Sequence, residues 1–236
     1  MQTQGTLFLI PCTLGDTTPL EVLPLLVKKA IEEIDVFIVE NEKNARRFIK
    51  SICPKKSQPS LIFSVINKYT DNTEIPDMLI PCLQGLNIGV ISDAGCPGIA
   101  DPGAAVVEQA HIKGIKVVPL VGPSSILLAM MASGFNGQNF SFNGYLPIDK
   151  GERKLEIKRL ERLSVEQNQS QLFIETPYRN NQMLESLMST LHPQTHICVA
   201  CDITLTTEYI KTHTANDWKK IKVDLHKRPT LFIIQK

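Results

Sequence analysis

The chain has 236 residues, of which 43% are hydrophobic and 21% charged, and its formal net charge is +1. This length suits one or two domains with a buried core, and the ordinary charged fraction excludes a disordered chain. The near-zero net charge excludes a strongly basic protein that binds nucleic acid over its whole surface. No apolar run approaches the roughly 20 residues that span a bilayer, and no signal peptide is recognisable, so we expect a cytoplasmic protein without a membrane anchor.

Apolar runs and helix signals alternate along the first half of the chain. Strands are predicted at residues 6–10, 35–39, 60–67, 87–92 and 115–120. Helices are predicted between them, at 43–49, 71–85 and 104–113, and from either residue 18 or Pro24 to about residue 34. Because buried strands alternate with helices, this half is expected to form a mainly parallel α/β sheet.

The second half has more strands and a less regular order. Strands are predicted at 140–145, 171–175, 196–201, 207–212 and 230–235, and helices at 125–132, 152–163 and 181–191. This order favours a second α/β domain with a mixed sheet. We therefore predict an α/β protein with two domains, residues 1–119 and 120–236.

Six cysteines are spread along the chain, and two of them, Cys198 and Cys201, form a C-x-x-C pattern. Residues three apart on a strand point to opposite faces, and no second pair completes four ligands. We therefore interpret these two as core cysteines, expect no metal site, and expect the six thiols to be reduced.

The loop at residues 92–103, SDAGCPGIADPG, is the most informative segment for function. It follows an apolar strand and precedes a helix, and ligands of open α/β sheets bind beyond the carboxyl ends of strands. Its three glycines allow a ligand to approach the backbone closely, and Asp93 and Asp101 can accept hydrogen bonds from ribose or amino groups. The alternative is a rigid turn in which Asp101 caps the next helix.

Two further loops have similar positions in the predicted sheet. Residues 11–16, PCTLGD, follow the first strand, and residues 122–125, GPSS, follow the fifth. Neighbouring strand-end loops meet at one edge of a sheet, so the three loops can share a ligand. For each loop taken singly, ordinary helix capping is the simpler interpretation.

These motifs resemble the tetrapyrrole methylase superfamily, and within it the branch that methylates ribosomal RNA of the small subunit. The resemblance rests, in order, on PCTLGD (11–16), VISDAGCPGIADPG (90–103), GIKVVPLVGPSS (114–125), SFNGYLP (141–147) and LFIETPYR (172–179). It extends from residue 6 to about residue 234. Its most specific part is the DAG-x-P-x-x-x-DPG loop followed by VPL-x-GPS.

The resemblance implies a methyltransferase with S-adenosylmethionine bound in a cleft between two α/β domains, and a homodimer. It implies 2′-O-methylation of a cytidine ribose in 16S ribosomal RNA, with that RNA or the 30S subunit as partner. Carried over by position, the cofactor-binding residues would be Pro11, Ser92, Asp93, Ala94, Gly95, Ile99, Ala100, Ser124, Ser125, Phe173, Pro229 and Thr230.

Methyl transfer to a ribose hydroxyl is helped by a base or a charge-stabilising group. Glu175 and Arg179 are the catalytic candidates, because they follow a predicted strand in a segment that the resemblance places at the cofactor. The alternative is an ion pair at the start of the next helix. Glu40 lies at the end of another predicted strand, where it can either face the substrate or cap a helix.

The chain departs from the family pattern at residues 41–45, where most of the family's basic and hydroxyl side chains are missing, and at 201–204. Two other functions therefore stay open: methylation of a small molecule such as a tetrapyrrole, and binding of S-adenosylmethionine without catalysis. A basic segment at 150–162 is interpreted as a solvated helix face, with a phosphate-contacting rim as the alternative.

Overall fold

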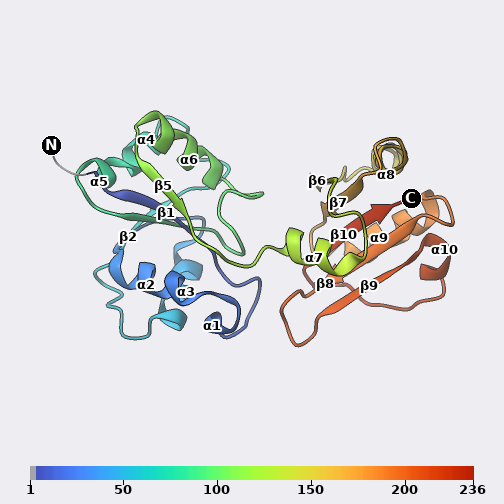
Figure 1. The fold of residues 1–236 in the computed structure, drawn as a ribbon, viewed down its shortest axis with the longest axis horizontal. Coiled ribbons are helices and arrows are strands. Elements are labelled where there is room, and N and C mark those ends of the chain that lie inside the picture. Colours follow the sequence, from blue (N-terminus) through green and yellow to red (C-terminus); the bar gives the residue numbers. More distant parts are fainter. Residues whose placement is uncertain (1–3) are drawn as a thin grey trace. The chain divides into compact units, whose positions relative to one another are not determined.

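The computed structural model describes residues 4–236, which form two compact α/β units (Figure 1). The first unit ends at Ser124 and the second begins at Ser125, whereas the sequence placed the boundary after residue 119. The first sheet is entirely parallel and the second is mixed. The predicted fold class is confirmed.

The first unit is a five-stranded sheet with the strand order β3-β2-β4-β1-β5. Its strands are β1 (Thr6–Ile10), β2 (Val36–Val39), β3 (Ile62–Val65), β4 (Ile88–Ile91) and β5 (Lys116–Pro119). Its helices are α1 (Pro19–Val22), α2 (Leu25–Glu33), α3 (Glu42–Ile52), α4 (Ile75–Met78), α5 (Ile80–Leu83) and α6 (Gly103–Ile112). Because every strand runs in the same direction, all five end at one edge of the sheet.

Helices cover both faces of this sheet, so its strands are apolar on both sides. Along β2, Phe37 packs with α2 and α3 in one core cluster, while the neighbouring Ile38 packs in another cluster with α4, α5 and α6. The central strands β2 and β4 are buried at every position. This explains why these segments read as continuous apolar runs.

The segment after β1 contains two short helices instead of one. Helix α1 begins at Pro19, whose ring suits the first helical position, and α2 begins after Pro24. Proline inside a helix removes a backbone donor and clashes with the preceding turn, so Pro24 separates the two. The two predicted starting points therefore correspond to two separate helices.

The second unit is a five-stranded sheet with the strand order β6-β7-β10-β8-β9, in which only the β6–β7 pair is parallel. Its strands are β6 (Phe140–Tyr145), β7 (Ser170–Ile174), β8 (His196–Cys201), β9 (Tyr209–Thr214) and β10 (Thr230–Gln235). Its helices are α7 (Ser125–Ser133), α8 (Lys150–Glu166), α9 (Asn180–Thr190) and α10 (Ala215–Trp218). No helix within residues 4–236 is long and apolar enough to cross a membrane.

One face of the second sheet packs with α8, α9 and α10 in a single apolar core. Cys201 belongs to this core, whereas Cys198 is buried on the other face, as the alternation along β8 predicts. Trp218, the only tryptophan, is fully buried in the core. Its indole N–H donates to the Ile197 carbonyl (2.8 Å), and its ring contacts His213 edge to face.

Replacing Trp218 with alanine is expected to destabilise the second unit by about 3–5 kcal/mol, because the loss of an aromatic side chain leaves a large cavity. Trp218→Phe keeps most of the volume and loses the hydrogen bond, so about 1–2 kcal/mol is expected. Urea unfolding followed by far-ultraviolet circular dichroism measures both. An unchanged transition in Trp218→Ala would contradict this description of the core.

Candidate functional site

Three strand-end loops of the first unit meet at the carboxyl edge of the parallel sheet. The backbone N–H of Cys12 donates to the carbonyl of Gly95 (2.9 Å), and the Cys12 thiol donates to the carbonyl of Ser92 (3.2 Å). The Cys96 thiol donates to the carbonyl of Pro123 (3.4 Å). The loops at 11–16, 92–103 and 122–125 are therefore in direct contact, as their places in the sheet predicted.

Two glycines make this close approach possible. Gly95 has φ +70°, and a Cβ atom there would lie 3.2 Å from the Leu14 side chain. A Cβ atom on Gly122 would lie only 2.2 Å from Cγ of Pro11. A side chain at either position would push the loops apart, so the sequence needs glycine at both.

Asp101 shapes the central loop. Its carboxylate accepts hydrogen bonds from the backbone N–H groups of Gly98 (2.8 Å) and Gly103 (2.7 Å), the latter being the first residue of α6. This confirms that Asp101 serves a rigid turn. Ala100 in the same turn has φ +62°, a conformation that costs a residue with a Cβ about 1–2 kcal/mol.

Asp93 has a different environment and remains exposed. Its N–H donates to Oε1 of Glu40 (2.9 Å), at the end of β2, and its Oδ1 accepts from the amide of Asn44 on α3 (3.1 Å). Asp93 is thus held in place from two neighbouring elements. Burial raises the pKa of Glu40, the hydrogen bond from Asp93 opposes that shift, and the charges of Asp101 and Asp93 add to it.

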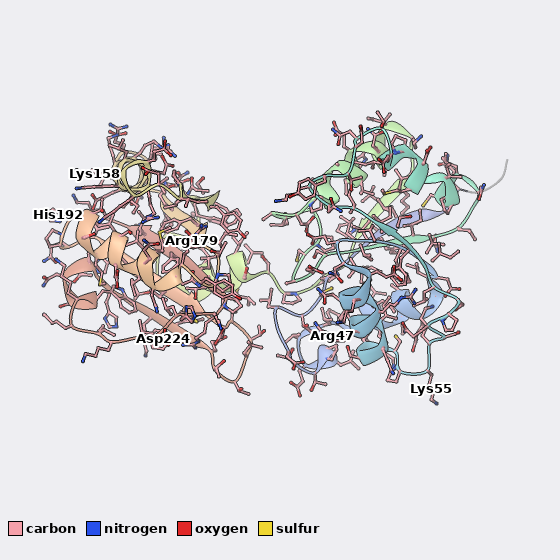
Figure 2. All side chains as sticks on the ribbon, turned by 180° about the vertical axis from the view of Figure 1, so that it is seen from behind. Arg47, Lys55, Lys158, Arg179, His192 and Asp224 are labelled. Atoms are coloured by element: carbon pink, nitrogen blue, oxygen red, sulfur yellow. The ribbon has the colours of Figure 1, made fainter. Side chains whose placement is uncertain are left out.

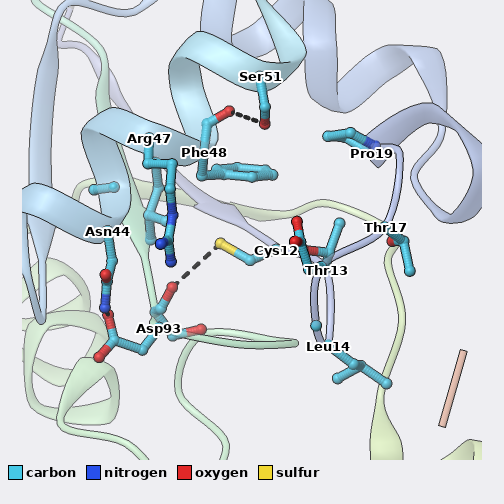
Figure 3. Close-up of a pocket in the computed structure, with 15 residues that line it drawn as sticks. Cys12, Thr13, Leu14, Thr17, Pro19, Asn44, Arg47, Phe48, Ser51 and Asp93 are labelled. Atoms are coloured by element: carbon cyan, nitrogen blue, oxygen red, sulfur yellow. Dashed lines mark hydrogen bonds between the residues drawn. The ribbon is translucent and has the colours of Figure 1, made fainter. Parts of the chain in front are cut away.

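A pocket of about 360 Å³ opens beside Asp93 (Figure 3). The loop after β1, the end of β4 and one face of α3 form its walls. The α3 residues in this wall include Asn44, Arg47, Phe48 and Ser51. The volume is at the lower end of the range for small-molecule sites.

The α3 residues were not among the predicted site residues; the sequence analysis expected only that residues 41–45 depart from the family pattern. A signal for them was present in the sequence. Positions 44, 47, 48 and 51 follow helical spacing and share one face of a helix that begins after a strand end. Asn41 also has a structural part, since its side chain caps α3 by accepting from the N–H of Asn44 (3.1 Å).

The predicted cofactor residues of the first unit divide by exposure. Asp93, Ala94, Ile99 and Ala100 are exposed on the loop, whereas Pro11, Ser92 and Gly95 are buried and can meet a ligand only at a loop edge. Ser124 ends the first unit, and Ser125 is the first residue of α7.

In the second unit the structure brings Glu175 into contact with Arg179, which Figure 2 labels. Glu175 Oε1 accepts from the Arg179 guanidinium (2.6 Å) and from the Thr176 N–H (2.6 Å), and its side chain is 1% exposed. The ion pair at the start of α9 is therefore present. Three buried atoms there have no hydrogen-bond partner among residues 4–236: Glu175 Oε2, Arg179 Nε and Asn180 Oδ1.

Two other predicted residues of this unit lie on the paired strands β7 and β10. Phe173 is fully buried and stacks on Phe232 in the core (centroids 5.9 Å apart), so its ring belongs to the core. Thr230 pairs with Cys201 at the start of β10, and its hydroxyl donates to the Arg228 carbonyl (3.0 Å).

The basic segment at 150–162 forms most of α8, and part of its charge is used internally. Arg153 is buried and donates to the Ser186 hydroxyl (3.2 Å) and the Ile148 carbonyl (2.9 Å). Arg159 pairs with Glu156 (2.6 Å). These contacts weaken the case for a continuous phosphate-contacting rim. In the part of the chain that the structure describes, no cluster of three or more His, Cys, Asp or Glu residues could hold a metal.

Replacing Glu40 with glutamine should stabilise the protein at neutral pH. The folded state binds the Glu40 proton more tightly than the unfolded state, so wild-type stability falls as pH rises from about 4.5 through the raised pKa. Glutamine removes that loss and can still accept the Asp93 N–H. Urea unfolding at pH 4 and pH 7 should give nearly equal stabilities at pH 4 and a more stable variant at pH 7; the reverse order would contradict the assignment.

The Cys12 thiol should be inert in the folded protein. Burial raises its pKa most strongly, and the charges of Asp93 and Glu40 raise it further. Since the thiolate is the reactive form, alkylation at pH 8 should be on the order of 100-fold or more slower than for a free cysteine. Peptide mapping after iodoacetamide treatment, with a guanidinium-unfolded control, checks this; rapid labelling of Cys12 in the native protein would rule it out.

Comparison with known proteins places this geometry in a family. A sequence profile of the tetrapyrrole (corrin/porphyrin) methylases matches residues 18–218. The protein named ribosomal RNA small subunit methyltransferase I from Thermotoga maritima is 30% identical over 209 residues, covering 89% of this chain and 85% of that protein. Its namesake from Vibrio cholerae is 28% identical over 208 residues, covering 87% and 67%.

Solved structures agree on the fold. The methyltransferase CobJ superposes with a TM-score of 0.66 at 17% identity, covering 98% of this chain and 94% of that one. Uroporphyrin-III C-methyltransferase from Thermus thermophilus, complexed with S-adenosylhomocysteine, gives 0.56 at 15% identity, covering 98% of both chains. The profile match spans most of the chain, and the chain therefore belongs to the tetrapyrrole (corrin/porphyrin) methylase family and is an S-adenosylmethionine-dependent methyltransferase.

Proposed function

We propose that this methyltransferase modifies RNA of the small ribosomal subunit, at the 2′-hydroxyl of a cytidine ribose. The observation that carries the proposal is the convergence of the three motif loops around Asp93, at the carboxyl edge of the parallel sheet. The curated relatives support the substrate, because they bear the name ribosomal RNA small subunit methyltransferase I. As the resemblance implies, we further propose a cytoplasmic homodimer.

Each unit, taken by itself, has residues that fit a part of S-adenosylmethionine. In the first unit, Asp93 offers a carboxylate to ribose hydroxyl or ammonium donors, on a loop where Gly98 has no neighbour closer than 3.9 Å to an added Cβ. In the second, Glu175 and Asn180 each have a buried oxygen with no partner among residues 4–236. Buried polar atoms are normally satisfied, so these fit a site that is completed by a ligand.

S-adenosylmethionine supplies the methyl group and the leaving group. The chain has to orient the acceptor hydroxyl, exclude water and take up a proton. Glu175 is our candidate for the proton acceptor, because Oε2 is unpaired while Oε1 is held by Arg179 and Thr176. Arg179 would then fix the orientation of that carboxylate.

The test uses purified protein, radiolabelled S-adenosylmethionine and 30S subunits from a strain that lacks this gene. Label should enter the RNA, and mapping should place it on a cytidine ribose. Asp93→Ala should weaken cofactor binding about 10- to 100-fold, the effect of losing a hydrogen bond to a charged group, and reduce transfer accordingly. Asp77→Ala is the matched control, since Asp77 is exposed on α4 and outside the site.

Calorimetry with S-adenosylmethionine separates the alternatives. Cofactor binding without transfer to 30S subunits would overturn the RNA proposal and direct the search to small acceptors such as tetrapyrroles. If no acceptor took the methyl group, binding without catalysis would remain. Equal loss in Asp93→Ala and Asp77→Ala would remove Asp93 from the cofactor site.

A further inference from the structure

The pocket beside Asp93 contains a cation that the fold does not use. Arg47 lies on the pocket face of α3, and Figure 3 places its guanidinium between Asn44 and Cys12. It makes no ion pair or hydrogen bond with any of residues 4–236. A guanidinium group that faces a cavity without such partners presents a planar set of N–H donors to an anionic ligand.

The adjacent arginine provides a contrast within the same helix. Arg46 pairs with Glu42 (2.8 Å), donates to the Gln58 carbonyl (2.7 Å) and lies over the Phe63 ring (4.5 Å to its centroid). Arg46 therefore fastens α3 to the rest of its unit. Arg47 makes no such contacts. Arg46 is therefore a structural arginine, whereas Arg47 is available to bind a ligand.

The rest of the pocket indicates which anion would bind. Phe48 contributes an aromatic ring, and Thr13 and Ser51 contribute hydroxyls. Thr17 also lines the pocket, and its hydroxyl oxygen is buried without a partner among the described residues. Inorganic phosphate would use the cation and the hydroxyls but not the aromatic ring, whereas a nucleotide supplies a phosphate for Arg47, sugar hydroxyls for the polar side chains and a flat base for Phe48.

The pocket also borders the proposed site of the methyl donor. Ser92 and Asp93 belong to its lining and at the same time to the loop assigned to the methyl donor. A molecule in the pocket would therefore meet the bound donor at Asp93. A site of about 360 Å³ suits one nucleotide and not a length of duplex.

We propose that this pocket binds the acceptor nucleotide and that Arg47 is the residue that holds its phosphate. The inference rests on the proposed RNA methylation and adds the position and the charge that would recognise the acceptor. Arg47 lies outside the motifs on which the family resemblance rests.

The test compares cytidine 5′-monophosphate, cytidine and inorganic phosphate as ligands in calorimetric titrations. Arg47→Gln should weaken monophosphate binding about 10- to 100-fold, as expected for a lost charge-assisted contact, and leave cytidine binding unchanged. Arg47→Lys should restore part of the affinity. Lys50→Gln makes the same charge change on an exposed position of α3 outside the pocket and should have no effect.

Three results would overturn the proposal. They are equal binding of monophosphate and cytidine to the unsubstituted protein, equal affinities for Arg47→Gln and the unsubstituted protein, and equal losses for Arg47→Gln and Lys50→Gln. Inorganic phosphate that binds as tightly as the monophosphate would reduce the site to a simple anion site and overturn the nucleotide assignment.

An assay of methyl transfer to 30S subunits tests this proposal separately from the proposed function. Arg47→Gln should raise KM for the subunit with little change in kcat. Normal transfer and an unchanged KM would refute the role of Arg47 while the RNA function stands. Arg47-dependent binding of the monophosphate without transfer to 30S subunits would support the pocket and refute that substrate.

Discussion

The hydrogen bond from the Cys12 N–H to the Gly95 carbonyl is the constraint on which the site depends. It joins the loop after β1 to the loop after β4, two neighbouring strands of the parallel sheet. Only residues without a side chain at Gly95 and Gly122 let the loops come this close. The sheet brings the loops to one edge, and the glycines let them touch.

The same arrangement accounts for residues that depart from the family pattern. We expected segment 41–45 to depart from the family pattern, and two of its residues have clear structural roles. Asn41 caps α3, and Asn44 holds the Asp93 carboxylate at the pocket edge. Glu40 completes this arrangement by accepting the Asp93 N–H. The altered segment thus still positions the central residue of the candidate site.

The sequence predicted the architecture well because its strongest signals, the apolar runs of the strands, follow directly from burial. The strands β1, β8 and β10 begin and end where their apolar runs do. The helix α10 was missed, because its four residues have little helical preference of their own and depend on the burial of Trp218. The segment predicted at 71–85 contains α4 and α5, each with a proline in its first turn.

The sequence indicated the loops of the candidate site, which the structure brings into contact, but it did not indicate the helix residues that line the pocket. Glycine and aspartate in a strand-end loop indicate either ligand binding or a rigid turn, whereas Arg47 and Phe48 resemble residues of any amphipathic helix until the pocket is seen. The contact between Glu175 and Arg179 was foreseen as one of two alternatives, and the orphaned Oε2 atom beside it was not. Orphaned atoms depend on packing from distant segments, so they are invisible in a sequence.

The division of the chain at Ser124 has a consequence for biosynthesis. All five strands of the first sheet lie between Thr6 and Pro119, and its two core clusters draw only on that unit. Domains generally fold as units during synthesis, the N-terminal one first. The three loops and the pocket can thus be complete while the ribosome is still translating the second sheet, whose β6–β7 pairing and last strand β10 come later. Once residues 1–124 have emerged from the ribosome, the chain outside it contains every residue whose contacts hold the Asp93 loop in the first unit.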